Sequence, residues 1–437
     1  MVLRKALITY LAGFYFIFLS SNIFASSYGD TYGFSTNGIS MGNAMVSHVD
    51  DWSSVYYNIA GLGRTPEISQ NGEKLKSEIA VNFLYTSPRF DIDIDRSVNG
   101  DEDLDFGIVM LGAALDINNI YELPGFISTA RIGFSLGLNS DMSVVNLNDL
   151  EPQTHNFMRY GDEARRSMIL VGAGFGFMDN SFGFGLGANI SFGGDGDVLL
   201  RDVNVSTEEQ VPEGQSKMTL KSKPSLLAGI YIDYGIYDLG LCYRQKSKLE
   251  ISPFNTVAVT NAGNINLNLV LSIFDYFQPD MFVFGSSVQS DDLLISFDLE
   301  YQMWSDFEVS SAQEYNFQSI IPELRDILVV KLGADFLFSE NTNFLCGYIY
   351  QPSFIPDSAT NGVVNFLDNN KHIGSLGIKY QIKQFLGFKG PVELSAGYQF
   401  QYLEKRDVVK SSPTTENPNY SYGGICHSFT FGFSLKL

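Results

Sequence analysis

The stretch Leu293–Trp304 reads LLISFDLEYQMW, and along it apolar and polar side chains alternate. Every second residue from the first is large and apolar, and the residues between them include Ser296, Asp298, Glu300 and Gln302. Successive side chains of a β-strand point to opposite faces, so this period of two predicts a strand with one apolar and one polar face. Its length is about twice the average in soluble proteins and matches the roughly 9 to 11 residues that cross a lipid bilayer.

The same alternation recurs along most of the chain. It predicts an all-β fold, a transmembrane antiparallel β-barrel of about 14 strands whose apolar faces contact lipid. A large soluble β-sandwich or β-helix is the alternative. Three of the predicted strands alternate poorly, namely 104–116, 216–233 and 264–289. The full set of predicted strands is 78–94, 104–116, 129–145, 167–177, 182–200, 216–233, 237–251, 264–289, 293–309, 326–338, 342–351, 371–382, 391–405 and 424–437.

Glycines occupy one face of Val171–Phe192 (VGAGFGFMDNSFGFGLGANISF), and Phe, Leu and Ala occupy the other. Met178–Ser181 in its middle is predicted to form a short turn that joins two antiparallel strands. Glycine weakens a strand and often marks a place where another backbone approaches closely. The bare inner face therefore predicts that another segment packs inside the barrel.

The composition excludes several classes of protein. The 437 residues are 45% hydrophobic, 14% aromatic and only 18% charged, and the formal net charge is −21. A nucleic-acid-binding protein needs a basic surface, so nucleic acid is not an expected partner. The abundance of large apolar residues also excludes intrinsic disorder.

The first five residues include the basic Arg4 and Lys5. An apolar run follows them up to Leu19, and small residues follow that run. This order predicts a cleavable secretory signal peptide over residues 1–25, with cleavage after Ala25 or after Ser27. An uncleaved membrane anchor is the alternative. No later apolar run reaches the roughly 18 to 20 residues of a membrane-spanning helix.

Residues 26–77 do not alternate, and they are rich in Gly, Ser and Asn. They contain too few large apolar residues to form a core of their own. We expect them to form a plug, or hatch, inside the lumen of a barrel that comprises residues 78–437.

Two parts of this plug, residues 33–44 (GFSTNGISMGNA) and residues 50–62 (DDWSSVYYNIAGL), resemble the N-terminal hatch of a known family. The family is that of the outer-membrane long-chain fatty acid and aromatic hydrocarbon transporters, the FadL-like proteins. Its hatch has spaced Ser and Gly, an acidic pair and then Asn-Pro-Ala-Gly-Leu, so Ile59 stands where the family has Pro. Further segments are similar to strand motifs of the family, in the same order: Gly240–Arg244, Asp298–Phe307, Leu332–Tyr350 and Ile355–Asp357. The last residues, Thr430–Leu437, resemble the C-terminal signal of outer-membrane barrels, with Leu437 in place of the usual Phe or Trp.

The resemblance implies a function and a place in the cell. It implies passive uptake of hydrophobic small molecules, either long-chain fatty acids or hydrocarbons, through a plugged barrel with a lateral exit. It also implies a multi-pass protein in the outer membrane of a Gram-negative-type bacterium. The expected partners are a hydrophobic ligand, outer-membrane lipid and, during biogenesis, the barrel assembly machinery. The alternatives are a general diffusion porin, a structural or adhesive outer-membrane protein and, with less support, an outer-membrane lipase; no enzyme activity is expected.

The resemblance also indicates where a gate lies. The expected hatch or gate residues are Asn58, Ile59, Ala60, Gly61, Ser40 and Gly42. Ligands of the family are thought to leave through a kink in the third strand. In this chain the residues that break the alternation of the third predicted strand are Asn139, Ser140 and Asp141. Asn58 can donate and accept hydrogen bonds, so it could satisfy backbone groups that a kink leaves unpaired; the alternative is that it caps a turn in the plug.

Some basic residues fall on the polar faces of the predicted strands, where a ligand carboxylate could bind them. They are Arg131, Arg244, Lys331 and Lys379. The alternative is that each pairs with a nearby acidic residue, namely Asp298, Glu300, Asp335 or Glu393. No cofactor and no metal site are expected, although Asp91–Glu102 has part of the spacing of a calcium-binding loop, with Arg96 where such a loop needs Gly. No catalytic residue is predicted, because the adjacent Cys426 and His427 would point to opposite faces of a strand.

Overall fold

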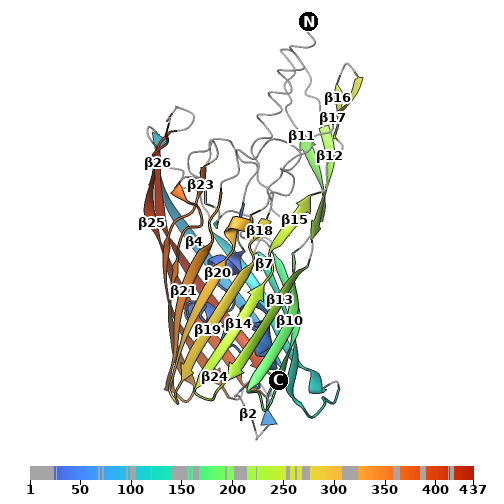
Figure 1. The fold of residues 1–437 in the computed structure, drawn as a ribbon, viewed down its shortest axis with the longest axis vertical. Helices are drawn as coiled ribbons and strands as arrows, with labels where there is room; N and C mark the ends of the chain where they lie inside the picture. The colour runs from blue at the N-terminus through green and yellow to red at the C-terminus, as the bar shows by residue number, and fades with distance from the viewer. Residues whose placement is uncertain are drawn as a thin grey trace.

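The structure is a computed structural model, and Figure 1 shows it as a tall barrel with its strands tilted against the long axis. It describes residues 24–25, 27–66, 69–70, 73–94, 97–98, 105–119, 121–139, 155–157, 159–160, 167–191, 194–200, 214–222, 224–251, 256–260, 263–267, 276–307, 323–357, 365–383, 390–411, 413 and 418–437. The predicted signal peptide up to residue 23 lies outside the described residues, and so do residues 95–96 and 99–102 of the loop Asp91–Glu102, which has part of the spacing of a calcium-binding loop.

A single antiparallel sheet forms the barrel wall and closes on itself. Neighbouring strands pair in chain order, and the last strand pairs with the first from Tyr420↔Ile94 to Lys436↔Glu78. This closure leaves no open edge at membrane depth, where lipid could not hydrogen-bond to an unpaired backbone. The wall strands are β4 (Glu78–Ile94), β6 (Phe106–Asp116), β7 (Ile127–Asn139), β9 (Met168–Phe177), β10 (Phe182–Ser191), β13 (Ser225–Asp233), β14 (Tyr237–Arg244), β19 (Met281–Gln289), β20 (Leu293–Gln302), β21 (Ile327–Ser339), β22 (Thr342–Gln351), β24 (Lys371–Ile382), β25 (Val392–Val408) and β26 (Tyr420–Lys436). The prediction of about fourteen antiparallel strands is confirmed.

Four of the predicted strands were too long, because each is divided in the structure. Within 182–200, 216–233, 237–251 and 264–289, only one part belongs to the wall. A strand of about ten residues already crosses the bilayer, so its continuation is free to pair elsewhere. Most of these continuations pair in a second sheet formed by β11 (Gly194–Leu200), β12 (Gly214–Ser222), β15 (Ser247–Ile251), β16 (Thr256–Thr260), β17 (Gly263–Leu267), β18 (Tyr276–Gln278) and β1 (Phe24–Ala25).

The remaining described elements are short. They comprise strands β2 (Ser69–Gln70), β3 (Glu73–Lys74), β5 (Ser97–Val98), β8 (His155–Phe157) and β23 (Asn365–Leu367), and the 3₁₀ turns η2 (Ile117–Asn119) and η4 (Trp304–Asp306). Within the described part of the chain, no helix has both the length and the apolar character needed to cross a membrane.

The two ends of the barrel differ in their connections. At one end, strands are joined by tight turns such as Met178–Ser181, and the chain ends there at Leu437 (Figure 1). We call this the turn end and the opposite one the loop end. In bacterial barrels, short turns lie on the periplasmic side and long loops on the extracellular side.

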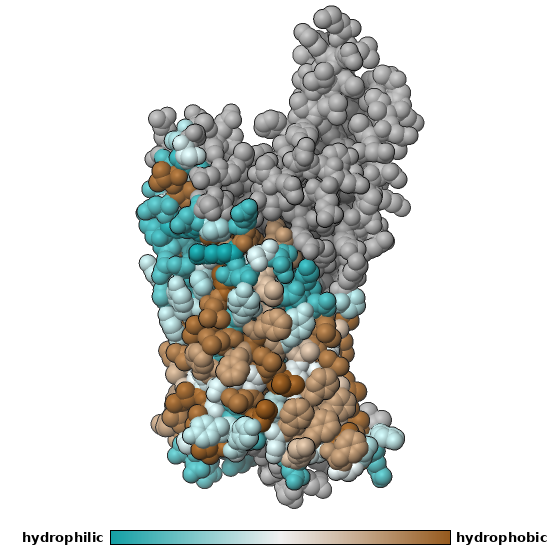
Figure 2. Space-filling model, in the orientation of Figure 1, coloured by the Kyte–Doolittle hydropathy of each residue, from teal (hydrophilic) through white to brown (hydrophobic). Residues whose placement is uncertain are grey.

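The outer surface of the barrel carries the apolar face that the alternation predicted. On the face that Figure 2 shows, a brown, hydrophobic band covers the lower part of the barrel, and a more teal, hydrophilic zone lies above it. Exposed side chains of the wall include Phe83, Phe134, Phe284, Leu332 and Phe431. Their sequence neighbours point inward and are buried polar residues, for example Asn82, Ser135 and Thr430. A surface of this kind is stable in lipid and not in water.

A plug made of residues 27–64 lies inside the barrel, drawn in blue in Figure 1. It contains the short helices α2 (Tyr28–Thr31), α3 (Thr36–Ser40) and α4 (Ser54–Tyr57) and the 3₁₀ helix η1 (Ile59–Gly63). Side chains of Ser27, Ser35 and Asn58 cap α2, α3 and η1 by accepting a hydrogen bond from the backbone. Isolated helices of four or five residues are not stable in water, so the contacts with the wall must hold the plug in shape.

Candidate functional site

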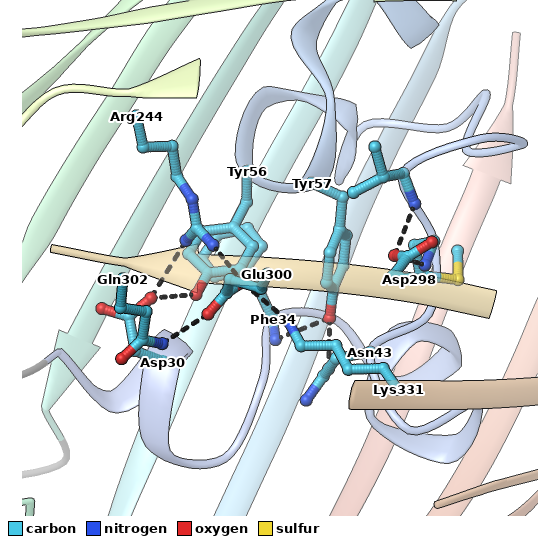
Figure 3. A network of polar contacts seen from close by, with 12 residues as sticks. Asp30, Phe34, Asn43, Tyr56, Tyr57, Arg244, Asp298, Glu300, Gln302 and Lys331 are labelled. Carbon is cyan, nitrogen blue, oxygen red and sulfur yellow. Dashed lines mark hydrogen bonds and ion pairs between the residues drawn. The ribbon is translucent and has the colours of Figure 1, made fainter. Parts of the chain in front are cut away.

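The plug is bound to one side of the wall through a cluster of charged side chains near the loop end (Figure 3). Asp30 of helix α2 accepts hydrogen bonds from Tyr56 Oη at 2.7 Å, Arg244 Nη1 at 3.0 Å and Gln278 Nε2 at 2.7 Å. Arg244 Nη2 also donates to Glu300 at 2.9 Å, and Lys331 Nζ donates to the same carboxylate oxygen at 2.8 Å. Two carboxylates face two cations, so the cluster is neutral. We call these six residues the Asp30 cluster.

A second attachment lies further along β20, at Asp298. Its Oδ2 accepts hydrogen bonds from the backbone N–H groups of Met45 at 2.9 Å and Val46 at 3.0 Å. Asp298 is fully buried, and within the described residues its other oxygen, Oδ1, has no hydrogen-bond partner. Asp298 and Glu300 lie two residues apart on β20, so this strand holds two separate parts of the plug.

Further along the wall, at β9 and β10, the plug rests against glycines, and neither of these two strands contains a charged residue. A Cβ atom added at Gly185 would lie 2.5 Å from the backbone carbon of Ile59, and one added at Gly174 would lie 2.6 Å from its carbonyl oxygen. The Ile59 side chain fills the space over Gly172 and Gly187. The inner face of β9 and β10 is bare because the backbone of η1 occupies the space that side chains would need, as the sequence predicted.

Asn58 connects the plug to the sixth wall strand. Its Nδ2 donates to the carbonyl of Val46 at 2.8 Å and to that of Ile230, in β13, at 3.0 Å. Its Oδ1 accepts from Ala60 N at 3.2 Å, so Asn58 also caps η1. The third strand, to which the sequence analysis linked Asn58, is not among these partners.

The other predicted hatch residues are packed tightly against their surroundings. The Ser40 hydroxyl donates to the carbonyl of Thr36 at 2.8 Å. Gly42 has a φ of +59°, and a Cβ there would lie 2.7 Å from the backbone nitrogen of Tyr348, so both conformation and space require glycine. Gly61 N donates to the Asn58 carbonyl at 2.8 Å, and a Cβ on Gly61 would lie 2.3 Å from the Val49 carbonyl oxygen. These contacts give the segment a single close-packed position; a gating role for it stays a prediction.

The third wall strand, β7, ends at Asn139, while Ser140 and Asp141 lie outside the described residues. Its pairing with β9 stops earlier, at Gly137↔Met168, whereas its pairing with β6 reaches Asn139. The backbone of Leu138 and Asn139 thus extends beyond the last pair of the β7–β9 ladder. The predicted kink itself stays a prediction.

The basic residues predicted to bind a carboxylate all have partners within the protein. Arg131 donates to the backbone carbonyls of Leu62 at 2.8 Å, Asp50 at 2.6 Å and Gly61 at 2.9 Å, so it ties β7 to the end of the plug. Arg244 and Lys331 belong to the Asp30 cluster, and Lys379 pairs with Asp335. For Arg244, Lys331 and Lys379 the structure thus has acidic partners that the alternative interpretation named, Glu300 for the first two and Asp335 for the third.

Sequence reasoning missed a second group of charges, because its members are far apart along the chain. Arg159 and Lys371 are fully buried near the loop end, and Arg159 Nε lies 3.3 Å from Asp368 Oδ1. The Arg159 guanidinium lies over the ring of Phe354, 4.6 Å from its centre. Within the described residues, Arg159 Nη1 and Nη2 and Lys371 Nζ have no hydrogen-bond partner. Lys371 begins β24 and looked in the sequence like a residue of a strand end.

Two small cavities lie beside the plug. The first is lined by Asp30, Tyr56, Glu300 and Lys331 together with the apolar Val329, Ile349 and Ile373. The second is lined by Tyr56, Arg244 and Gln278 together with the apolar Val55, Met168, Leu170 and Leu227. Each has a volume of about 10 Å³ for the centre of a water molecule, which is room for roughly one water. Among the described residues, no group of three or more His, Cys, Asp or Glu side chains is arranged to hold a metal ion.

Comparison with known proteins agrees with this geometry. No family model matches the chain. Alkane uptake protein A of Marinobacter nauticus is 24% identical over 94% of this chain and 91% of its own length. The crystal structure of a Pseudomonas aeruginosa FadL homologue superposes with a TM-score of 0.53 at 13% identity, covering 95% of this chain and 98% of that one.

The chain has a FadL-like fold. A second structure of this kind, the Pseudomonas putida toluene transporter TodX, has a TM-score of 0.50 at 11% identity and covers 93% of this chain and 99% of its own. The resemblance predicted from the plug and strand motifs is confirmed. The FadL-like barrel also indicates an outer-membrane protein, and two of the proteins named here are an alkane uptake protein and a toluene transporter.

Proposed function

We propose that this chain is a passive outer-membrane channel for hydrophobic small molecules. The observation that carries the proposal is a lumen filled by a plug whose adjacent cavities hold about one water molecule each. Cavities of this size do not admit a hydrophilic solute much larger than water. An apolar ligand, in contrast, can displace apolar side chains at little cost, because it replaces their contacts. Two of the similar proteins are named for alkane uptake and for toluene transport, and both names support the same class of ligand.

A ligand entering from the loop end meets an apolar cluster first. The members of this cluster come from η4, β18, β21, β22, β24 and the segment after β22, and they include Phe277, Trp304, Phe354, Ile349 and Ile373. Trp304 and Phe354 stack with their ring centres 4.0 Å apart. Aromatic and aliphatic side chains that converge in this way provide a surface on which a hydrophobic ligand can bind before it reaches the plug.

We place the exit at the third and fourth wall strands. The β7–β9 ladder stops at Gly137↔Met168, and the second cavity is lined by Met168 and Leu170 of β9. A lateral opening needs backbone groups that are not committed to a ladder, since lipid offers no replacement partners. Asn139, Ser140 and Asp141 follow directly, so the predicted kink and this end of the ladder coincide in the chain.

The charges near the loop end favour a ligand with an anionic group. Arg159 pairs with the buried carboxylate of Asp368, and Lys371 Nζ has no hydrogen-bond partner within the described residues, so these three side chains carry a formal charge of +1. A buried charge without a counter-ion is strongly unfavourable, and a carboxylate on the ligand would relieve that. The proposal therefore includes long-chain fatty acids as well as neutral hydrocarbons, with Arg159 and Lys371 as the carboxylate site in preference to the four residues that the sequence named.

Uptake by cells tests the function. The full chain is expressed in a Gram-negative host that lacks its own channel for hydrophobic compounds, and the initial uptake of radiolabelled n-hexadecane and oleate is measured. We expect uptake of at least one of them well above that of cells with an empty vector. A competition experiment then compares the two ligands: Lys371→Met should weaken oleate uptake and leave hexadecane uptake unchanged. Equal uptake with and without the chain would contradict the proposal.

The alternatives predict different measurements. A general porin would give a large steady conductance in planar bilayers, and an outer-membrane lipase would hydrolyse esters as purified protein. An adhesive protein would show neither of these and no uptake. We also propose cleavage of the predicted signal peptide after Ala25 or Ser27, which N-terminal sequencing of the mature protein decides.

A further inference from the structure

The two cavities beside the plug share one lining residue, Tyr56. Three apolar residues that line the first cavity, Val329, Ile349 and Ile373, also belong to the apolar cluster at the loop end. The second reaches the wall at Met168 and Leu170, where the β7–β9 ladder stops. A path that joins the two cavities, and with them the entry and the exit proposed above, runs past Tyr56.

The partition between the cavities is made of side-chain contacts. Three of its bonds each join a residue that lines the first cavity to one that lines the second: Asp30 to Gln278, Asp30 to Arg244 and Glu300 to Arg244. The phenol of Tyr56 completes it by donating to Asp30. Side chains can rotate without unfolding the barrel, so a partition of this kind can open while the wall strands stay paired.

The Tyr56 ring is held on both of its faces. The Phe34 ring stacks on it with centres 4.9 Å apart, and the Arg244 guanidinium lies 4.7 Å from its centre. A Cβ atom at Gly29 would lie 2.8 Å from the ring, so the helix α2 comes close because that residue is glycine. The ring thus has one well-defined closed position, and the Asp30 bond fixes its outer edge.

We propose that Tyr56 is the gate of this channel and that its ring determines which hydrophobic ligands pass. This inference rests on the proposed function. In the closed state the phenol bonds to Asp30 and the ring separates the cavities. When the ring rotates away, the cavities join, and a slim linear ligand passes between Arg244 and the apolar side chains of β9 and β13. A bulky ligand is excluded because Phe34 and Arg244 stay in place.

Two substitutions of Tyr56 separate its two roles, and the neighbouring Tyr57 provides a matched control. Tyr56→Phe removes the bond to Asp30 but keeps the ring, and Tyr56→Ala removes both. Tyr57 is also buried on α4, and its hydroxyl bonds to Phe34 N at 2.9 Å and Asn43 Oδ1 at 2.6 Å, but it lines neither cavity. Tyr57→Phe therefore removes buried hydrogen bonds from the same helix of the plug, while the three bonds of the partition and the bond from Tyr56 to Asp30 are kept.

The experiment measures the initial uptake of n-hexadecane, which is linear, and of pyrene, which is bulky, in cells that express each full-length variant. Heat-modifiable migration of the extracted barrel confirms assembly, and entry of the hydrophilic β-lactam nitrocefin reports any general leak. We expect Tyr56→Phe to speed hexadecane uptake by about tenfold, the effect of losing one hydrogen bond to a charged group. We expect Tyr56→Ala to raise the ratio of pyrene to hexadecane uptake by about tenfold, with nitrocefin entry unchanged. Tyr57→Phe should behave as wild type.

Each outcome decides between the hypotheses. Wild-type uptake no higher than that of the empty vector contradicts the proposed function and with it the gate. Wild-type uptake that is unchanged in both Tyr56 variants leaves the proposed function standing and refutes the gate alone. If nitrocefin entry rises in parallel with the hydrophobic ligands, or if Tyr57→Phe has the same effect, Tyr56 only holds the plug and the gate is refuted.

Discussion

The plug has two sides that are held by different physical means. Towards β14, β20 and β21 it is bound by buried charges, in the Asp30 cluster and at Asp298. Towards β9 and β10 it is fitted by shape, because glycines let the backbone of η1 touch the backbone of the wall. Charged groups keep a partner over several rotamers, whereas a fitted backbone contact is lost once the surfaces separate. A small displacement of the plug therefore opens space first at the glycines of β9 and β10. The charged contacts act as the pivot of that displacement.

The comparison is tested most severely by Gly185→Val. A Cβ there would lie 2.5 Å from the Ile59 backbone carbon and 2.6 Å from Ala60 N, and neither is a flexible side chain that could move away. Overpacking of this kind costs about 1–3 kcal/mol or more, so we expect η1 to leave the wall. The ladder of β10 with β9 and β13 is unaffected, so the barrel still assembles. Entry of nitrocefin should rise about tenfold or more, as a plug contact worth about 1.4 kcal/mol or more is lost.

Gly374→Val is the control for that experiment, since a Cβ at Gly374 meets no atom within 4 Å. It should assemble and exclude nitrocefin as wild type does. A correctly assembled Gly185→Val barrel that also excludes nitrocefin would show that the glycine side does not hold the plug.

The charged side is tested by Asp298→Ala. The substitution leaves the N–H groups of Met45 and Val46 without their acceptor, and a buried unsatisfied group costs about 1–3 kcal/mol. Removal of a buried carboxylate offsets part of this, so we expect the plug segment around Met45 to lose about 2 kcal/mol of local stability. Hydrogen exchange of these amides measured by mass spectrometry should accelerate by more than about tenfold. Asp298→Asn, which keeps an acceptor oxygen, should accelerate it less; equal exchange in all three proteins would contradict the attachment.

A smaller effect is expected from Asn58→Ala. Asn58 lies between the two regions, because it bonds to β13 and caps η1. Asn58 loses its bonds to Val46 and Ile230 and its cap on Ala60, worth about 1–2 kcal/mol together. We expect hydrophobic uptake to fall several-fold while barrel assembly and ligand capture at the cell surface are unchanged. Asn37→Ala is the matched control, because Asn37 also joins the plug to the wall, through Glu393 at 2.8 Å, but far from η1. An equal loss in both variants would mean general loosening of the plug, and unchanged uptake would show that Asn58 takes no part in gating.

The barrel was predictable from sequence because alternation and length, the two features that identify a wall strand, lie within a single stretch of the chain. In Leu293–Trp304 the alternation indicates which side chains face lipid, and the length of the strand indicates that it crosses a membrane. The glycine face of Val171–Phe192 likewise predicted a packed lumen, because a strand face without side chains leaves room for another backbone to approach closely. Where strands continue past the bilayer, as in 237–251, the same pattern no longer distinguishes wall from loop, and the predicted ends were wrong.

The site was less predictable because its members come from distant parts of the chain. Asp30, Tyr56, Arg244 and Gln278 meet only after the plug enters the barrel, and no spacing in the sequence records that. Arg244 and Lys331 were recognised as lumen residues, but their partners decide whether they bind ligand or plug. Arg159 and Lys371 were missed for the same reason. Within the plug, the sequence analysis identified one departure from the family that the hatch resembles, Ile59 in place of Pro.

Ile59→Pro should have the smallest effect. It tests whether side-chain packing on the glycines or rigidity of the backbone holds η1 in place. Asn58 is extended, with φ −157° and ψ 104°, which suits a residue before proline, and position 59 is the first of η1, where proline is favoured. The side chain, however, fills the space over Gly172 and Gly187 with its Cδ1 atom, which proline cannot reach. Loss of that packing costs about 1 kcal/mol, and the reduced freedom of the unfolded chain returns about 0.4–1 kcal/mol. Hydrogen exchange of Ala60 and Gly61 should therefore stay within about fivefold of wild type, equivalent to about 1 kcal/mol. A much larger acceleration would show that Ile59 itself, by its fit to the glycine wall, holds this end of the plug, whereas slower exchange would show that backbone rigidity matters more there than shape.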